Sequence, residues 1–349
     1  MHGGDIYRNK TEYDFSINLN PCDTPKQVLE AAKKSLDLID TYPDIKCENL
    51  KRQLSGLFGI DSNCIVCGNG ASEILMAVVH EVRPQKALLF APGFSGYEHV
   101  LRAYDTKVSF CFDEFDLDRK IRTLRPDIFI YANPNNPTGR LRTREEIEAL
   151  ADACQKSGTV FVVDECFISL TGKERESSMI PVLGRYKNAI VLRAFTKSFS
   201  VPGVRLGFAI IENEKFAVSI ERHLPEWNVS VIAQCVGNAA CKERKFIEKS
   251  AEYIAKEREY LSKELKELGF DVTPSEANYI LFYKNESELD KASISEGSKT
   301  LYEKLLERGI LIRDCSDYKG LTRGNYRISV KKHEDNIYLI EKIKEVLGE

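Results

Sequence analysis

The sequence offers no segment that would hold the chain in a membrane. No apolar run in its 349 residues approaches the roughly 18 residues that a membrane-spanning helix needs. The first residues, from Met1 to Asp5, lack the basic and apolar regions of a signal peptide. We therefore expect the protein to remain in the cytoplasm.

Charge and cysteine content exclude two further classes of protein. The formal net charge is only −3, which gives no general attraction for nucleic acid or anionic lipid, so any anion binding must be local. Among ten cysteines, Cys64 and Cys67 form the only C-x-x-C pair, and no second pair follows at zinc-finger spacing. Most of the others stand singly in apolar stretches, which favours reduced core cysteines and no metal site.

Short apolar runs alternate with amphipathic segments from residue 46 to about residue 245. Runs of this kind, rich in β-branched and aromatic side chains, are typical of buried strands. We expect strands at 64–67, 86–90, 127–132, 159–164, 189–195 and 205–211, with helices such as 144–156 between them. This alternation predicts a large α/β domain around a mostly parallel sheet.

The two ends of the chain are expected to form a separate, smaller domain. Residues 1–45 predict an extended arm to about Asn20 and then a helix over 25–40. Residues 246–349 begin within a long charged helix and continue as strand, helix, strand and helix, which predicts an α+β domain. The segment 286–297 is expected to be a surface loop.

Residues with the chemistry to bind one ligand follow the ends of several predicted strands. In open parallel sheets, ligands gather at the carboxyl ends of the strands. The segments at these ends are 68–73, 92–94, 133–139, 164–165 and 196–198. They supply backbone N–H groups for an anion, an aromatic ring, an amide, a carboxylate and an amine. One ligand with a phosphate, a flat ring, a ring nitrogen and an aldehyde would use all five.

Each of these residues has an ordinary structural interpretation when it is taken alone. Gly70, Ala71 and Ser72 precede a helical segment, where phosphate is stabilised, but a plain glycine turn fits equally well. Asp164 is a helix cap or turn residue, or it holds a pyridine nitrogen protonated. Lys197 is a solvated loop residue, or burial lowers its pKa toward nucleophilic use.

Three arginines are candidates for anion binding. Arg205 stands eight residues after Lys197, where a guanidinium could hold a phosphate by two hydrogen bonds. Arg313 and Arg327 lie on short predicted strands near the C-terminus and would suit an anionic substrate. Taken singly, each is more often part of a surface ion pair.

Together these residues resemble the fold-type-I pyridoxal-phosphate (PLP) enzymes, in the class I and II aminotransferase family. The likeness extends over essentially the whole chain, and its most specific parts are the segment 196–207 and the loop Asn-Pro-Asn-Asn-Pro-Thr-Gly at 133–139. It implies the PLP-dependent transferase fold, with a mostly parallel seven-stranded sheet in a large domain and a small α+β C-terminal domain. It also implies PLP bound to Lys197 as a Schiff base.

The resemblance assigns the other cofactor contacts residue by residue. Asp164 would pair with the pyridine nitrogen, Asn136 would hydrogen-bond the phenolic oxygen, and Phe94 would stack on the ring. Lys197 would also move protons during the reaction. The phosphate would be held by Gly70, Ala71, Ser72, Thr196 and Arg205.

Within the family, the chain is most similar to two branches, the histidinol-phosphate aminotransferases and the threonine-phosphate decarboxylases. The features that lean toward the decarboxylases, and so toward cobalamin biosynthesis, are the start at 2–5 with the segment 14–21, and the segments 193–197, 225–229 and 311–315.

This likeness also implies substrate contacts and a homodimer. His2, Asn18, Arg313 and Arg327 would contact the anionic groups of a phosphorylated amino acid, with the N-terminal arm over the active site. Tyr42 would reach the active site of a second subunit. A free chain end for His2, and local packing for Tyr42, are the alternatives.

Two residues depart from the usual pattern of the transaminases. Phe167 stands three residues after Asp164, where a tyrosine usually meets the cofactor oxygen, so one control of the imine pKa is lost. Ala194 stands three residues before Lys197, where a phosphate-binding serine or threonine is common. The first departure leans away from ordinary transamination.

The sequence leaves three hypotheses for the function of the protein. The main hypothesis is decarboxylation of O-phospho-L-threonine or O-phosphoserine to an amino-alcohol phosphate. The alternative is an aminotransferase that moves an amino group to a 2-oxo acid, with histidinol phosphate as the first candidate substrate. A non-catalytic PLP-binding regulator is the third, but the chain has no basic helix-turn-helix segment to spare, and Lys197 and Asp164 are intact.

Overall fold

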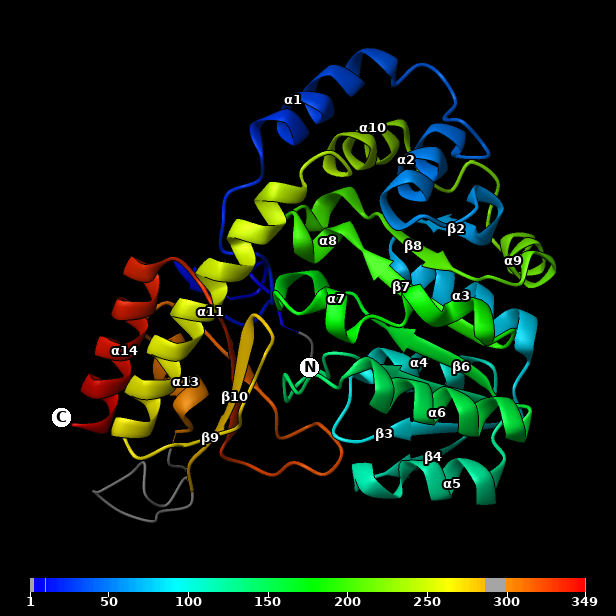
Figure 1. Ribbon diagram of the computed structural model, residues 1–349. Coiled ribbons are helices and arrows are strands. Elements are labelled where there is room, and N and C mark those ends of the chain that lie inside the picture. The colour runs from blue at the N-terminus through cyan, green and yellow to red at the C-terminus, as the bar shows by residue number, and fades with distance from the viewer. Residues whose placement is uncertain (1–2, 10, 286–298, 349) are drawn as a thin grey trace.

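A computed structural model describes residues 3–9, 11–285 and 299–348 of the chain. The predicted loop over 286–297 lies outside the described residues, and so does His2. The described chain forms one sheet of seven strands, one of four and one of two, arranged as Figure 1 shows.

The seven-stranded sheet has the strand order β2-β8-β7-β6-β5-β3-β4. Its strands are β2 (Ile65–Gly68), β3 (Lys86–Phe90), β4 (Lys107–Cys111), β5 (Ile128–Ala132), β6 (Val160–Asp164), β7 (Ala189–Ala194) and β8 (Gly207–Ile210). β8 is antiparallel to β2 and β7, and the other neighbours are parallel. The predicted mostly parallel sheet is confirmed.

β4 is the strand that the sequence analysis did not name. It lies at the edge of the sheet, and its side chains change from exposed at Lys107 to buried at Cys111. An edge strand does not need apolar side chains on both faces, so it lacks the continuous apolar run that marks the central strands.

Helices cover both faces of this sheet (Figure 1). The helices on one face are α3 (Ala71–Val82), α4 (Ser95–Ala103) and α9 (Glu214–Glu221). Those on the other are α2 (Glu48–Phe58), α5 (Leu117–Leu124), α6 (Arg144–Ser157) and α10 (Val231–Ala240). Successive residues of β5 enter the two cores alternately, Ile128 on one face and Phe129 on the other.

The helix α11 (Arg244–Glu267) joins this sheet to the C-terminal part of the chain (Figure 1). Its 24 residues extend over about 36 Å. Phe246 packs against the core of the large sheet, whereas Leu261 and Leu265 belong to the C-terminal core. One helix therefore spans both cores.

The C-terminal core contains an antiparallel sheet with the order β12-β13-β10-β9. Its strands are β9 (Asp271–Val272), β10 (Tyr279–Tyr283), β12 (Arg313–Asp314) and β13 (Asn325–Ser329). The helices α13 (Leu301–Leu306) and α14 (His333–Leu347) pack with it. The predicted small α+β unit is thus present in the described residues.

The N-terminal residues are divided between the two cores. β1 (Tyr13–Asp14) pairs in parallel with β11 (Ile310–Leu311), and Phe15 lies in the C-terminal core. By contrast, α1 (Lys26–Ser35) packs along α10 and places Val28 in the core of the large sheet. The predicted unit 1–45 therefore contributes its arm to one core and its helix to the other.

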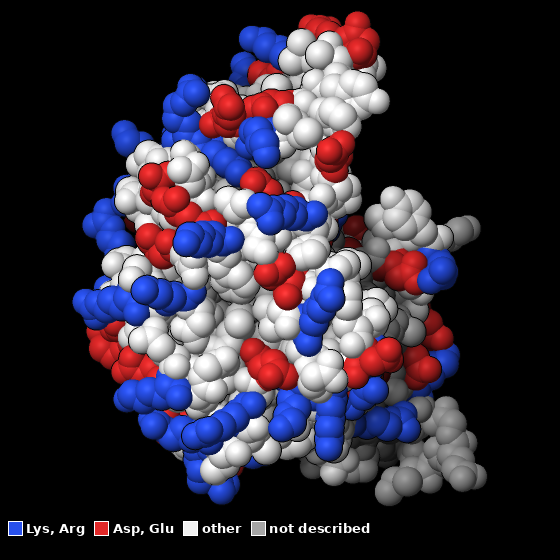
Figure 2. All heavy atoms as spheres, turned by 90° about the vertical axis from the view of Figure 1, so that its right-hand side faces the viewer, with Lys and Arg blue, Asp and Glu red and all other residues white. Residues whose placement is uncertain are grey.

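The described surface carries charges of both signs without a large field of one sign on the face drawn in Figure 2. None of the described helices is long and apolar enough to cross a membrane. In the same part of the chain, no cluster of His, Cys, Asp and Glu side chains could hold a metal ion. Cys64 and Cys67 are both free and buried.

Gly207 allows a close approach between β8 and the start of α3. A Cβ atom at this position would lie 2.4 Å from the backbone nitrogen of Ala71 and 2.7 Å from the carbonyl carbon of Gly70. We expect Gly207→Ala to lower the free energy of unfolding by about 1–3 kcal/mol, because backbone must shift. Urea denaturation measures this, with Gly203→Ala as the control, since a Cβ atom there meets open space. Equal losses in both variants would contradict this interpretation.

Candidate active site

Lys197 lies in the short helix that follows β7. This helix, α8 (Phe195–Ser198), begins directly after Ala194 and places Lys197 at the carboxyl end of a central strand, beside the buried Thr196. Burial, and after it the positive charge of Arg327, lowers the pKa of the Lys197 amine to about 8, although Asp164 acts in the opposite direction. Near neutral pH, part of this amine is therefore unprotonated and nucleophilic.

The N-terminal arm is fastened to the turn that carries Lys197. The backbone N–H of Asn20 donates to the carbonyl oxygen of Lys197 (3.1 Å), and its side chain donates to the carbonyl oxygen of Ser198 (2.7 Å). Asn18, two residues earlier, is buried, and its Oδ1 has no hydrogen-bond partner among the described residues. The arm therefore brings an unused polar atom to this region.

Asp164 is the last residue of β6, and hydrogen bonds hold both of its carboxylate oxygens. The hydroxyl of Tyr97 donates to Oδ2 (2.6 Å), and the backbone N–H of Cys166 donates to Oδ1 (2.9 Å). Burial, together with the charge of Asp164, raises the pKa of Tyr97 well above its usual value. The phenol therefore keeps its proton and remains a donor.

Arg327 reaches from β13 to the large sheet and to the N-terminal arm. Its Nη1 donates to Oδ1 of Asn136, its Nη2 donates to the carbonyl oxygen of Ser16 (2.8 Å), and its guanidinium lies 5.6 Å from the centroid of the Tyr279 ring. Since Oδ1 of Asn136 faces Arg327, the amide nitrogen of Asn136 is the group left for a ligand. The loop 133–139 of the large sheet and the C-terminal sheet therefore meet at Arg327.

Arg327 is a buried charge without a counter-charge in the described chain. It is 5% exposed, no described carboxylate forms an ion pair with it, and its Nε has no hydrogen-bond partner there. A buried guanidinium that only neutral groups solvate is costly. The surroundings of Arg327 are therefore suited to bind an anion.

Arg313 lies directly opposite Arg327 on the neighbouring strand. Its Nη2 donates to both carboxylate oxygens of Asp317 (2.7 and 2.9 Å). Burial, the largest single effect, lowers the pKa of Arg313, but the hydrogen bond to Asp317 and the negative charges around it together outweigh burial and raise that pKa. Tyr318 lies between the two arginines, under the guanidinium of Arg313 and with its hydroxyl 3.4 Å from Nη1 of Arg327. An anion that binds Arg313 must compete with Asp317.

The start of α3 forms a cradle of hydrogen-bond donors with Arg205. Gly70 has φ +86°, and a Cβ atom there would lie 2.7 Å from Nη2 of Arg205. Ala71 and Ser72 open the helix, where backbone N–H groups have no partner within the helix. The Arg205 guanidinium is exposed, contacts the carbonyl oxygen of Pro202 at 3.5 Å and forms no ion pair with a described carboxylate. These donors suit a phosphate.

Phe94 stands immediately before α4 and packs against the first turn of this helix. Its ring contacts Tyr97 edge to face, with 5.4 Å between the ring centroids and an angle of 83° between the planes. A Cβ atom at position 96 would lie 2.3 Å from Cε1 of Phe94, so Gly96 makes room for the ring. Phe94 and the partner of Asp164 therefore belong to one helical turn.

The two departures from the transaminase pattern are visible in the structure. Phe167 packs edge to face against Tyr279 (5.2 Å between centroids), and Nζ of Lys197 lies 5.9 Å from the centroid of its ring. The position therefore offers a ring and no hydroxyl to the region of Lys197. Ala194 ends β7 and likewise offers no hydroxyl.

Tyr42 lies on the surface of the chain. Its side chain is 76% exposed, and its ring contacts that of Trp227, with 4.9 Å between the centroids. His2, the other residue for which the sequence left an alternative, is outside the described residues.

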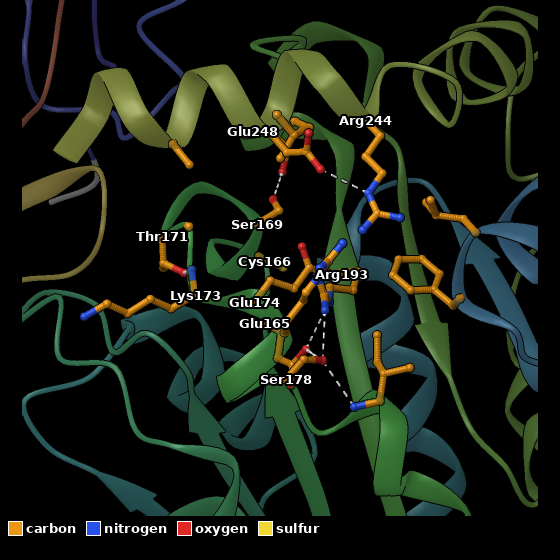
Figure 3. A pocket seen from close by; sticks show the side chains of 18 of the residues that line it. Glu165, Cys166, Ser169, Thr171, Lys173, Glu174, Ser178, Arg193, Arg244 and Glu248 are labelled. Carbon is orange, nitrogen blue, oxygen red and sulfur yellow. Dashed lines mark hydrogen bonds and ion pairs between the residues drawn. The ribbon is translucent and has the colours of Figure 1, made fainter. Parts of the chain in front are cut away.

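A separate cavity of about 830 Å³ lies between α7 (Glu174–Ser177), α11 and the ends of β6 and β7 (Figure 3). Lys197 and Asp164 do not line it. Its wall contains Arg193, which forms ion pairs with Glu165 (2.8 Å) and Glu174 (2.9 Å). Although Arg193 precedes Lys197 by only four residues, its charge is therefore balanced by the two carboxylates in the wall of this cavity.

Three tyrosines of the site, Tyr97, Tyr279 and Tyr318, were not predicted from the sequence. The spacing from Phe94 to Tyr97 was an available signal, because residues three apart share a face of a helix. No comparable signal exists for the other two tyrosines, because the packing of the C-terminal sheet against the large sheet brings them to the site.

The described groups fit the ligand that the strand ends predicted. The cradle of Gly70 and Arg205 suits a phosphate, the Phe94 ring suits a flat ring, the fixed carboxylate of Asp164 suits a ring nitrogen, and Lys197 suits an aldehyde. PLP combines these four groups. These residues are therefore the candidate PLP site, with Arg327 beside it for an anionic substrate.

Comparisons with known proteins find relatives over nearly the whole chain. The family model for aminotransferase class I and II matches residues 10–343. A putative threonine-phosphate decarboxylase from Caldanaerobacter subterraneus subsp. tengcongensis is 32% identical over 98% of this chain and 93% of that protein. A histidinol-phosphate aminotransferase from Thermoanaerobacter pseudethanolicus is 30% identical over 96% of this chain and 93% of that protein.

Solved structures show the same fold. The histidinol-phosphate aminotransferase from Clostridium acetobutylicum has a TM-score of 0.86 and 29% identity, and the match covers 96% of this chain and 99% of that chain. The one from Sinorhizobium meliloti, solved with PLP, has a TM-score of 0.87 at 20% identity over 97% and 92% of the two chains. The chain therefore belongs to the aminotransferase class I and II family and is a PLP-dependent enzyme.

Proposed function

We propose that the enzyme decarboxylates a small phosphorylated amino acid, first of all O-phospho-L-threonine or O-phosphoserine, to an amino-alcohol phosphate. The observation that carries this proposal is the pair of buried arginines, Arg313 and Arg327, directly opposite each other on β12 and β13. Like charges opposite each other on neighbouring strands are destabilising, and Asp317 balances only one of them. A substrate phosphate, which carries more than one negative charge near neutral pH, would supply the missing counter-charge.

The cofactor contacts are proposed on the positions described above. Lys197 would hold the aldehyde carbon, Asp164 the ring nitrogen, Asn136 the phenolic oxygen and Phe94 the ring face. Gly70, Ala71, Ser72, Thr196 and Arg205 would hold the phosphate. When bound, PLP supplies an electron sink for a bond broken at the α-carbon of the substrate.

The side chains around the cofactor decide which bond at the α-carbon of the substrate breaks. The bond perpendicular to the ring plane is the one that breaks, so orientation selects the reaction. If Arg313 and Arg327 bind the substrate phosphate and leave the carboxylate perpendicular, carbon dioxide leaves and the α-carbon takes up a proton. Lys197 suits this proton transfer, because a pKa of about 8 leaves both of its protonation states accessible.

Amino transfer is the second candidate function, with histidinol phosphate as the first substrate to test. It requires Arg327 to hold a substrate carboxylate in the ring plane, so that the α-proton leaves instead. The bidentate hydrogen bond between Arg313 and Asp317 favours this candidate, because it occupies the arginine that a phosphate would need. Relatives with both names match this chain at 32% and 30% identity.

We further propose that two copies of the chain form a homodimer through the apolar surface around Tyr42. The exposed fractions of its large side chains are 54% for Leu36, 47% for Leu38, 68% for Ile39 and 42% for Trp227. Three of these side chains lie within residues 36–39, close in sequence to Tyr42, and Trp227 contacts Tyr42. Exposed apolar side chains gathered in this way are typical of an interaction site. A partner on this surface would bring Tyr42 to the active site of the other subunit, as the family resemblance implies.

Incubation of the PLP-loaded enzyme with O-phospho-L-threonine tests the proposed reaction. We expect release of carbon dioxide while the absorbance spectrum of the cofactor returns to its starting form. Lys197→Ala, loaded with PLP in the same way, is expected to release none. Conversion of the cofactor to pyridoxamine phosphate without carbon dioxide would contradict decarboxylation and identify an aminotransferase.

The low pKa of Lys197 predicts a pH profile for acetylation of this amine in the cofactor-free protein. Only the unprotonated amine reacts, so the rate should rise through about pH 8 and not near the usual value for lysine. Arg327→Gln removes a positive charge that disfavours the ammonium form, so its profile should move to higher pH. Arg313→Gln should change it much less, because Asp317 balances that charge. Peptide mass spectrometry measures the rate at each pH.

A charge within the apolar surface around Tyr42 is expected to lower the molecular mass of the protein in solution. We expect Ile39→Glu to convert the dimer to monomers at micromolar concentration, as measured by light scattering after gel filtration, because a charge would be buried without a partner. Phe115→Glu is the control, since Phe115 is also exposed, at 85%, but lies outside this surface. A monomeric parent chain, or an unchanged dimer in Ile39→Glu, would count against the proposed interface.

A further inference from the structure

The hydrogen bond from Tyr97 to Asp164 is a contact of the candidate site that the proposed function does not use. The two oxygens lie 2.6 Å apart, which is usual for a charge-assisted hydrogen bond between a hydroxyl and a carboxylate. Tyr97 is 5% exposed, and burial raises the pKa of its phenol well above the usual value. The phenol therefore keeps its proton near neutral pH and remains a donor.

Tyr97 completes a two-point hold on the carboxylate. The backbone N–H of Cys166 fixes Oδ1, and the Tyr97 hydroxyl fixes Oδ2. With one donor alone, the carboxylate could rotate about its bond to Cβ. With two donors, its remaining lone pairs keep a single direction.

The same helical turn positions the ring face and the carboxylate. Phe94 and Tyr97 contact each other edge to face at the start of α4, and Gly96 provides the space for the Phe94 ring. A shift of this turn would therefore move both the stacking ring and the donor to Asp164. The turn therefore links the position of the Phe94 ring to that of the Asp164 carboxylate, although the two residues are 70 positions apart in the sequence.

We infer that Tyr97 is a positioning residue of the cofactor site, which acts through Asp164 to fix how strongly the ring nitrogen of PLP is held in its protonated form. This inference rests on the proposed placement of Asp164 at the ring nitrogen, but on neither of the two proposed reactions. Without the Tyr97 hydroxyl, one of the two contacts that orient the Asp164 carboxylate is lost, so the carboxylate rotates more freely. A carboxylate that faces the ring nitrogen less of the time stabilises the protonated form of that nitrogen less.

The test compares Tyr97→Phe with Tyr104→Phe as a matched control. Tyr104 is the residue that ends the same helix, and its hydroxyl contacts His80 at 3.3 Å and not Asp164. We expect Tyr97→Phe to raise the dissociation constant of PLP about tenfold, as for loss of one hydrogen bond to a charged group. With ¹⁵N-labelled PLP, the resonance of the ring nitrogen should move toward its unprotonated position. Tyr104→Phe should leave both quantities unchanged.

A double-mutant cycle with Asp164→Asn separates positioning from a general effect on folding. If Tyr97 acts through Asp164, the effect of Tyr97→Phe on PLP affinity should disappear in the Asp164→Asn background. A merely structural tyrosine would instead weaken both backgrounds alike and leave the ¹⁵N resonance of the bound cofactor in place. Either of these two results would overturn the inference, even if the variants unfold more readily.

A failure of this inference can be told apart from a failure of the proposed function by the same measurements. They need no substrate, so failure of the chain to release carbon dioxide from O-phospho-L-threonine would leave them valid. Borohydride reduction of the PLP-loaded parent protein, followed by peptide mass spectrometry, checks the placement first. Absence of the cofactor on Lys197 would refute the proposed site, and with it the role of Tyr97.

Discussion

The structure depends on the buried guanidinium of Arg327. It joins the N-terminal arm at Ser16, the loop of the large sheet at Asn136 and its own strand in the C-terminal sheet. Its partners are neutral in the described chain, so the charge is solvated but not balanced, which is an expensive arrangement for a residue that is 5% exposed. Arg327 therefore has two effects. It fixes the junction between the N-terminal arm, the large sheet and the C-terminal sheet, and its unbalanced charge attracts an anion there.

The large sheet supplies the other half of the site through its strand directions. Because β6 and β7 are parallel neighbours, Asp164 at the end of β6 and Lys197 in the helix that follows β7 lie at one edge. Burial at this edge lowers the pKa of Lys197, and the charge of Arg327 adds to the effect. An amine that would be inert on the surface thus becomes a nucleophile because of where two sheets meet.

The two proposed reactions differ in which group of the substrate the arginines hold, and not in the parts that hold the cofactor. Asp317 is central to this difference, because it balances Arg313 while Arg327 keeps an unbalanced charge. A phosphate strong enough to displace Asp317 would free the carboxylate for loss. A substrate without such a group would leave its carboxylate to Arg327.

The sequence alone determined the sheet and the residues along its edge. Continuous apolar runs specify strands that are buried on both faces, so six strands of the large sheet, and with them Asp164 and Lys197, were predictable. The edge strand β4 has no such run and was missed. Only the tertiary structure decided the partners of these residues, namely Tyr97 on Asp164, Asp317 on Arg313, and Asn136 and Ser16 on Arg327. These contacts join residues from different elements, most of them far apart in the chain, and periodicity along the chain carries no information about which elements pack together.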